Sequence, residues 1–354
     1  MPDLAPALCA RIAAEGPLPL ETVMAEAVAA YYAEGRAFGR AGDFVTAPEI
    51  SQVFGELVGV WMALRWIAAG RPPRVVLCEC GPGRGTLIAD LLRAAQSVPG
   101  FADAIELHLV ETSAALRATQ KTALGGFPAR WHDDFAALPT DAPLLLVANE
   151  FLDALPVRQM VRRGATWRAV RVGLAEDGLG FVDGPETLPP PDLVAALPPP
   201  AEGDVIEHRP AAEAFARDLG HRLAAQGGAA LLFDYGPAES GYGDSLQAVR
   251  RHACVPLLET PGAADLSAHV DFARVAAAAR PAAAFGPAPQ GRWLVAMGLR
   301  ERTAQLAANA TPEQARALAS GAARLCEAPA MGRLFKALAL LPPGADAPEG
   351  FGKS

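Results

Sequence analysis

The sequence predicts an α/β fold built on a doubly wound, mostly parallel sheet. Short apolar runs with strand character alternate with segments of helical periodicity through the middle of the chain. The run at 75–80 passes into a three-glycine turn at 81–85 and then into an apolar helical segment, and the run at 105–110 ends at Glu111. A strand that leads through glycines into a helix is typical of sheets that bind nucleotide-like ligands at their carboxyl edge.

The order of the expected elements supports this fold class. Helical periodicity is expected at 4–14, 20–33 and 53–69, before the sheet begins. The expected sheet strands are 75–80, 105–110, 129–131, 144–148 and 229–233. The expected helices between them are 87–95, 114–124 and 211–225. Strands separated by helices favour parallel pairing, because each crossover returns the chain to the same edge of the sheet.

The remaining segments are expected to decorate the sheet. Alternating residues at 157–161 and 167–172 around a glycine turn predict a hairpin added to the sheet edge. The proline-rich run at 188–200 predicts a surface loop. C-terminal helices are expected at 299–308, 312–326 and 331–340. The expected divisions are an N-terminal helical and lid region at 1–70, a core at 71–300 with insertions near 157–205 and 236–265, and C-terminal helices with a frayed tail at 301–354.

Composition limits the function classes. The 354-residue chain is 51% hydrophobic and carries a net charge of −8, which argues against a nucleic-acid partner and is compatible with a cationic one. Apolar runs are too short to span a membrane, and Asp3, Arg11 and Glu15 interrupt the N-terminus, so we expect no membrane insertion and a cytoplasmic location. The five cysteines are scattered, so we expect buried thiols and no metal site.

The glycine turn favours one cofactor over another. The pattern Gly81-x-Gly83-x-Gly85 differs from the G-x-G-x-x-G spacing that seats a pyrophosphate. Glu79, just before the turn, would repel a pyrophosphate but suits the ammonium group of a methionine-derived ligand. The turn therefore favours S-adenosylmethionine over NAD, and a dehydrogenase is the less favoured interpretation. A simple structural turn is the alternative.

Glu111 supports the same cofactor. It follows the next apolar run and stands 28 residues after Gly83. A carboxylate at this strand end is placed to accept the two ribose hydroxyls of an adenosyl group. The two strand ends together predict an adenosyl cofactor site.

A third polar segment follows the run at 144–148. Asn149, Glu150 and Asp153 are expected at the carboxyl edge of the sheet, over the reactive end of the cofactor. A sulfonium repels a cationic acceptor, and carboxylates at Glu150 and Asp153 would offset this repulsion, while the Asn149 amide oxygen would accept an N–H. These residues are the predicted catalytic group. The alternative is that the two acids only cap a turn.

Five segments, which follow one another along the chain in the same order as in a known family, carry a resemblance to that family. They are 42–56, 79–86, 149–157, 243–249 and 264–272. With these segments the chain resembles the MidA-like methyltransferase family, which includes the mitochondrial arginine methyltransferase that assists assembly of respiratory complex I. The resemblance spans roughly residues 10 to 310. It implies a Rossmann-like class I methyltransferase fold, S-adenosylmethionine as cofactor, and an arginine of a protein, such as a complex I subunit, as acceptor.

The resemblance also assigns segments that spacing alone does not. It implies that 42–52 folds over the cofactor as a lid, with polar contacts from Asp43, Thr46, Glu49, Ser51 and Gln52; a helix start capped by Thr46 and Glu49 is the alternative. It implies that Asp133 or Asp134 binds the adenine amino group and that Phe135 covers its face. A loop with two exposed acids is the alternative there.

Two rival functions stay open at this point. One is a methyltransferase for a small amine or a nucleobase, although the acids at Glu150 and Asp153 favour a cation. The other is a non-catalytic assembly or adaptor protein that keeps a cofactor fold to bind a partner. The sequence predicts neither the oligomeric state nor the acceptor protein.

Overall fold

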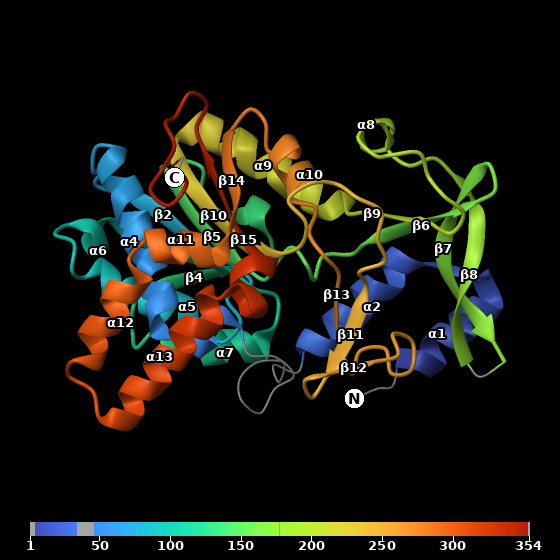
Figure 1. Ribbon diagram of the computed structural model, residues 1–354, viewed down its shortest axis with the longest axis horizontal. Coiled ribbons are helices and arrows are strands. Elements are labelled where there is room, and N and C mark those ends of the chain that lie inside the picture. Colours follow the sequence, from blue (N-terminus) through green and yellow to red (C-terminus); the bar gives the residue numbers. More distant parts are fainter. Residues whose placement is uncertain (1–3, 34–45, 177, 353–354) are drawn as a thin grey trace. The chain divides into compact units, whose positions relative to one another are not determined.

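The computed structural model describes residues 4–33, 46–176 and 178–352 (Figure 1). The chain forms two compact units that interleave along the sequence. The insertion unit draws on Met1–Phe44, Leu152–Ala214 and Pro237–Arg274, and the core unit draws on Val45–Phe151, Phe215–Gly236 and Val275–Ser354. This organisation differs from the predicted linear division at 1–70, 71–300 and 301–354, because each unit is assembled from three separated segments.

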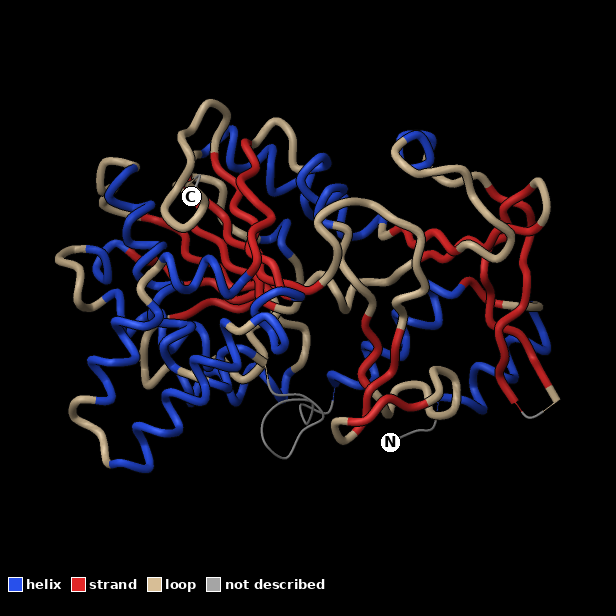
Figure 2. The backbone as a smooth tube through the Cα atoms, in the orientation of Figure 1, coloured by secondary structure: helices blue, strands red, loops and turns tan. Residues whose placement is uncertain are grey.

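The core unit contains a seven-stranded sheet. Its strands are β2 (Val75–Cys80), β3 (Ile105–Val110), β4 (Ala129–His132), β5 (Leu144–Asn149), β10 (Gly228–Tyr235), β14 (Ala283–Pro289) and β15 (Phe335–Leu341). Their order is β14-β15-β10-β5-β2-β3-β4. The five strands from β10 to β4 pair in parallel, and β15 pairs antiparallel with β10 and β14. The predicted mostly parallel sheet is confirmed, and Figure 2 shows its strands side by side among helices.

Helices surround this sheet. Those of the core unit are α3 (Ala47–Ile50), α4 (Gln52–Ala68), α5 (Thr86–Ala95), α6 (Phe101–Ala104), α7 (Ala114–Ala123), α11 (Gln290–Ala296), α12 (Leu299–Ala307) and α13 (Pro312–Cys326), with short turns η1 (Phe135–Ala137) and η2 (Ala328–Gly332). Both α9 (Pro210–Gln226) and α10 (Phe272–Ala278) carry residues of both units. In the core, the buried ring of Phe233 on β10 packs edge-on against Phe54 of α4 and Trp293 of α11, each at 5.0 Å between ring centroids. Aromatic contacts of this kind hold the helices onto the sheet.

The predicted helix at 331–340 is wrong. Residues 335–341 form β15, which lies between β10 and β14 and pairs antiparallel with both. Its leucines and alanines are good helix formers, but the continuous apolar run suits a strand with neighbours on both sides. The partner strand β14 is rich in alanine and proline and shows no strand signal in the sequence. The expected helices at 299–308 and 312–326 are present as α12 and α13.

The insertion unit contains two smaller sheets. Its elements are α1 (Leu4–Glu15), β1 (Leu18–Pro19), α2 (Leu20–Ala33), β6 (Arg158–Arg163), β7 (Thr166–Ala175), β8 (Gly178–Thr187), α8 (Pro191–Ala195), β9 (Val205–His208), β11 (Gln247–Arg250), β12 (Ala253–Val255) and β13 (Asp265–Ser267). One sheet has the order β1-β7-β6-β9 with β8 paired to β7, and the other has the order β12-β11-β13.

The predicted hairpin is present, but its predicted place at the edge of the main sheet is wrong. Strands β6 and β7 pair antiparallel around Gly164, and both belong to the five-stranded sheet of the insertion unit. Buried Val157 and Val172 pack there with α1 and α2 residues such as Leu8 and Met24. The apolar faces of the N-terminal helices therefore provide a core that is separate from the main sheet.

Across the described ranges, no helix combines the length and the apolar character that crossing a bilayer requires.

Candidate cofactor and acceptor site

The glycine turn after β2 has the backbone geometry that its sequence predicts. Gly81, Gly83 and Gly85 have φ values of +66°, +53° and +82°, in the left-handed region that favours glycine. The turn leads directly into α5, with Gly85 at the N-cap. A Cβ atom added at Gly81 would lie 3.1 Å from the ring of Phe151. The turn therefore joins β2 to a helix N-terminus through backbone conformations that favour glycine, which is the arrangement expected of a cofactor loop.

Glu79 is an ionisable group in a dry environment. Its side chain is 2% exposed, and burial raises its pKa to about 8 despite a hydrogen bond from the backbone N–H of Ile88. Among the described residues, its Oε2 atom has no hydrogen-bond partner. A buried acceptor in this state has a strong preference for a cationic donor. The ammonium group of S-adenosylmethionine fits this requirement.

Glu111 lies at the end of β3, beside the end of β2, because Val110 pairs with Cys80. Its carboxylate is held on both oxygens: Oε1 accepts the N–H of Ser113 at 2.7 Å, and Oε2 accepts the side-chain amide of Gln120 at 3.1 Å. Burial raises the pKa of Glu111. The structure therefore brings Glu79, the glycine turn and Glu111 to adjacent strand ends, as an adenosyl ligand would need.

Gln120 is a residue that the sequence reasoning missed. It lies on α7, is fully buried, and connects Glu111 to the glycine turn. Its only signal in the sequence is a polar residue on the apolar side of a helix, four residues after Leu116. Such a position does not reveal its partner.

The segment after β4 is partly locked by local contacts. Asp133 and Asp134 are exposed; Asp133 pairs with Arg117 at 2.7 Å, and Asp134 accepts the N–H of Ala137 at 3.0 Å as the N-cap of η1. The ring of Phe135 packs edge-on against Phe215 at 5.3 Å. Asp133 and Asp134 are therefore two exposed acids with local partners, which is the alternative to adenine binding that the sequence left open.

The Phe135 ring belongs to an aromatic row. Phe215 of α9 packs in the same way against Phe151, which lies next to Gly81. The guanidinium of Arg222 lies 5.2 Å from the centre of the Phe135 ring. The row therefore links the segment after β4 to the glycine turn, and it places Phe135 at the same edge of the sheet.

Asn149 and Glu150 form a hydrogen-bonded pair at the end of β5. Glu150 has φ of +51°, which is rare and strained for a residue with a side chain. Its Oε1 atom accepts the Nδ2–H of Asn149 at 3.1 Å and the backbone N–H of Ala47, at the start of α3, at 3.3 Å. Asn149 is 8% exposed, and among the described residues its Oδ1 atom has no hydrogen-bond partner. A buried hydrogen-bond acceptor is therefore available at the end of β5, where the sequence predicts that the methyl-accepting substrate docks.

Asp153, the third predicted catalytic residue, belongs to the insertion unit. Its side chain is buried, and its backbone carbonyl accepts the N–H of Ala268 at 3.2 Å and the guanidinium of Arg209 at 3.4 Å. These contacts hold the main chain at Asp153 within that unit.

Thr46 and Gln52 occupy the start of α3 and of α4. The carbonyl of Thr46 accepts the N–H groups of Glu49 and Ile50, while its hydroxyl makes no capping bond. Glu49 accepts the hydroxyl of Thr86 at the start of α5, so the alternative capping box between Thr46 and Glu49 is not formed. Gln52 donates to Glu56 at 3.0 Å. Asp43 of the predicted lid lies outside the described residues.

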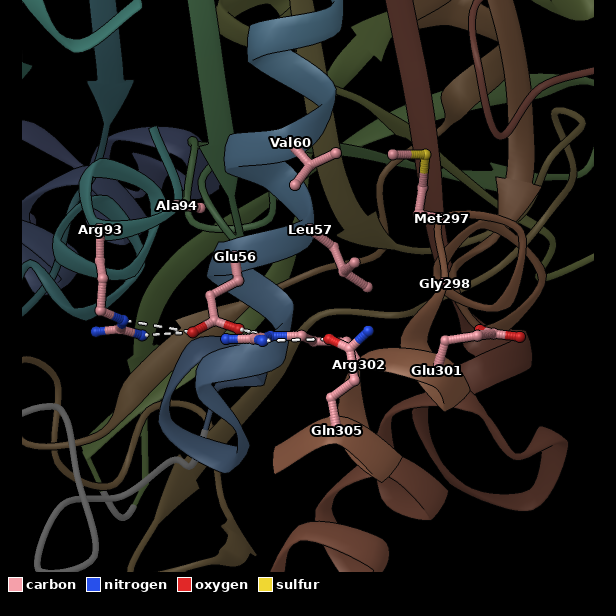
Figure 3. Close-up of a pocket in the computed structure, with 10 residues that line it drawn as sticks. All are labelled: Glu56, Leu57, Val60, Arg93, Ala94, Met297, Gly298, Glu301, Arg302 and Gln305. Atoms are coloured by element: carbon pink, nitrogen blue, oxygen red, sulfur yellow. Dashed lines mark hydrogen bonds and ion pairs between the residues drawn. The ribbon is translucent and has the colours of Figure 1, made fainter. Parts of the chain in front are cut away.

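A separate cavity of about 370 Å³ lies between α4, α5 and α12 of the core unit (Figure 3). Buried Glu56 accepts hydrogen bonds from Arg93 at 3.1 Å and Arg302 at 2.7 Å, and the two guanidinium groups approach it from opposite sides. None of the predicted site residues lines this cavity. The hydrogen bonds of Glu56 with Arg93 and Arg302 therefore connect α4 to α5 and to α12.

The sheet order, the left-handed glycine turn and the buried acids at the strand ends define a cofactor-dependent α/β enzyme. Comparison with known proteins specifies the class: residues 57–288 match the family model described as "Putative S-adenosyl-L-methionine-dependent methyltransferase". The chain belongs to this family, its cofactor is S-adenosylmethionine, and the expected α/β methyltransferase fold, cofactor and enzyme class are confirmed.

Relatives extend over most of the chain. It is 34% identical to the protein arginine methyltransferase NDUFAF7 homolog of Drosophila melanogaster, over 96% of this chain and 85% of that one. It is 33% identical to human NDUFAF7, a protein of the same description, over 94% of this chain and 82% of that one. A solved structure from Burkholderia thailandensis, bound to S-adenosyl-homocysteine, has a TM-score of 0.82 at 28% identity and covers 99% of this chain and 95% of that one.

The expected cytoplasmic location is contradicted by these relatives, which are described as mitochondrial proteins. The expectation rests on charged residues near the start of the sequence, and such residues do not identify a compartment.

Proposed function

We propose that the protein is a protein arginine N-methyltransferase in which Asn149 and Glu150 hold the acceptor guanidinium. The observation that carries this proposal is the buried Oδ1 atom of Asn149, which has no partner among the described residues and whose amide is tied to the Glu150 carboxylate. A guanidinium carries only donors, so it matches a site that offers an amide oxygen beside a carboxylate.

Glu150 and Asn149 have different roles in the proposed reaction. S-adenosylmethionine supplies a methyl group on a positively charged sulfur. The Glu150 carboxylate, which is hydrogen-bonded to Asn149, would offset the repulsion between this charge and the guanidinium and would receive the proton that the methylated nitrogen loses. Asn149 Oδ1 accepts one N–H, which would hold the reacting nitrogen about 3 to 3.5 Å from the methyl carbon.

Asp153, Thr46 and Gln52 complete the predicted site residues. From their places in the sequence, Asp153 is proposed as a further carboxylate, and Thr46 and Gln52 are proposed as polar contacts to the cofactor. On the cofactor side, Glu79 would hold the ammonium group, Glu111 the ribose, Asp133 or Asp134 the adenine amino group, and Phe135 the adenine face.

The names of the relatives support arginine as the acceptor, since the curated proteins similar to this chain are described as protein arginine methyltransferases. We propose a subunit of respiratory complex I as the acceptor protein, on the resemblance stated above. A nucleobase acceptor is less consistent with an acidic chain and an amide and carboxylate pair.

One experiment tests this proposal directly. The purified protein is incubated with methyl-labelled S-adenosylmethionine and an extract of cells that lack this protein, and the labelled residue is located by mass spectrometry. We expect label on an arginine of a complex I subunit. Label on a small amine or a nucleic acid would refute the arginine assignment, and label on an arginine of an unrelated protein would refute only the complex I assignment.

A further inference from the structure

We infer that Gln120 is a positioning residue for ribose recognition, because it fixes the Glu111 carboxylate relative to the glycine turn. The Nε2 atom of Gln120 donates to the carbonyl of Gly83 at 2.8 Å and to Oε2 of Glu111 at 3.1 Å. The inference rests on the proposed function in one respect, namely that Glu111 receives the ribose hydroxyls.

Trp131 determines which way the amide faces. The indole Nε1–H of Trp131 donates to Oε1 of Gln120 at 2.8 Å. An indole N–H can only donate, so the amide oxygen must face Trp131 and the NH₂ group must face Gly83 and Glu111. All three polar contacts of this fully buried side chain are therefore used in one orientation.

The second oxygen of Glu111 is fixed independently. Its Oε1 atom accepts the backbone N–H of Ser113 at 2.7 Å, so the carboxylate is held from both sides. A carboxylate can accept about four hydrogen bonds, and the contacts from Ser113, Gln120 and the Thr112 backbone leave capacity for a hydroxyl. Gln120 thus orients the carboxylate and leaves its acceptor capacity available.

Gln120 also lies next to the glycine turn, so it supports the turn as well as Glu111. A Cβ atom at Gly85 would meet the Gln120 side chain at 3.4 Å, so Gln120 touches the turn at Gly85 as well as bonding it at Gly83. Substitution of Gln120 therefore affects both the turn and Glu111, and the test must separate ribose recognition from general support of the turn.

The test compares two ligands. Calorimetry measures binding of S-adenosyl-homocysteine and of its 2′,3′-dideoxyribose analogue to the wild-type protein, Gln120→Leu and Glu111→Gln. We expect Gln120→Leu to weaken S-adenosyl-homocysteine binding about tenfold more than binding of the dideoxy analogue. An equal loss for both ligands would show that Gln120 only supports the turn and would overturn the inference, as would unchanged binding of both.

Two further variants keep the outcome readable. If Glu111→Gln does not reduce the preference for the ribose hydroxyls, the proposed role of Glu111 fails, and the result for arginine labelling is unaffected. Trp131→Phe, which removes the indole N–H and leaves a smaller ring, serves if Gln120→Leu does not fold. We expect it to lower ribose selectivity by a smaller factor, because the Gln120 amide can then rotate, and unchanged selectivity there would overturn the inference.

Discussion

The side-chain amide of Asn149 donates to the Glu150 carboxylate over 3.1 Å, and this contact leaves the opposite atom of the same amide, Oδ1, as a buried acceptor. Glu150 holds its position with a left-handed backbone at φ +51°. A strained acidic residue beside an unsatisfied amide is the kind of arrangement that active sites maintain. The predictions below test this pair and the neighbouring cofactor residues.

Glu150→Gln should separate binding from turnover. The substitution keeps an oxygen that can accept the N–H of Ala47 but removes the negative charge. We expect methyl transfer to fall by about 10² or more, while binding of S-adenosyl-homocysteine stays near the wild-type value. The control is Glu301→Gln, an exposed carboxylate on α12. Near-normal turnover of Glu150→Gln would show that Glu150 only caps α3.

Gly83→Val should abolish cofactor binding. Valine is strained at φ +53°, so the turn cannot keep its conformation with this residue. Gly125→Val is a matched control, since Gly125 has φ of +58° and open space around its Cβ position. We expect calorimetry to detect S-adenosyl-homocysteine binding to the Gly125 variant and none to the Gly83 variant. Unchanged affinity in a folded Gly83→Val protein would contradict the assignment of the turn.

Ligand binding should release a proton near pH 7. Burial raises the pKa of Glu79 to about 8, so its carboxyl is mostly protonated at pH 7 before binding. An ammonium group brought to Oε2 favours the ionised form, so Glu79 loses its proton when the ligand binds. Calorimetry in two buffers with different ionisation heats should report this release for the wild-type protein. Equal release from Glu79→Gln would assign the proton to another group.

The same pKa shift sets a stability trend. A carboxyl whose folded pKa is raised favours the folded state fully below the unfolded value of 4.5, and this contribution is lost as pH rises towards 8. We expect Glu79→Gln, which cannot ionise, to gain stability relative to the wild-type protein between pH 5 and pH 8 in denaturant unfolding. A constant difference across this range would refute the raised pKa.

Glu56→Ala should destabilise the core unit. Burial disfavours the Glu56 charge, but hydrogen bonds from Arg302 and Arg93 outweigh it and lower the pKa of Glu56. The substitution removes contacts to α5 and α12 together, and we expect the free energy of unfolding to fall by about 2 kcal/mol. Because the pKa is lowered, the difference from the wild-type protein should shrink as pH falls below about 4. Glu301→Ala, in the same cavity, should have little effect.

The sequence predicted the parallel part of the sheet and its ligand-binding edge. Strands such as 75–80 and 105–110 are mostly apolar, and their ends carry glycines or acids that no strand interior requires. Local patterns of this kind are sufficient to predict Glu79, Gly83 and Glu111 as cofactor-binding residues. These strand and turn patterns involve residues that are adjacent in the sequence, so they can be recognised without knowledge of the tertiary structure.

Tertiary structure decided what depends on distant partners. The run at 335–341 has helix-forming residues and becomes β15 only because β10 and β14 offer hydrogen bonds on both sides. The hairpin of β6 and β7 joins a second sheet because α1 and α2 bring the apolar surface that covers it. Gln120 acquires its role only when α7 packs against the turn and Trp131 fixes its amide. The local sequence does not predict these contacts, because the groups that stabilise them are far away in the sequence.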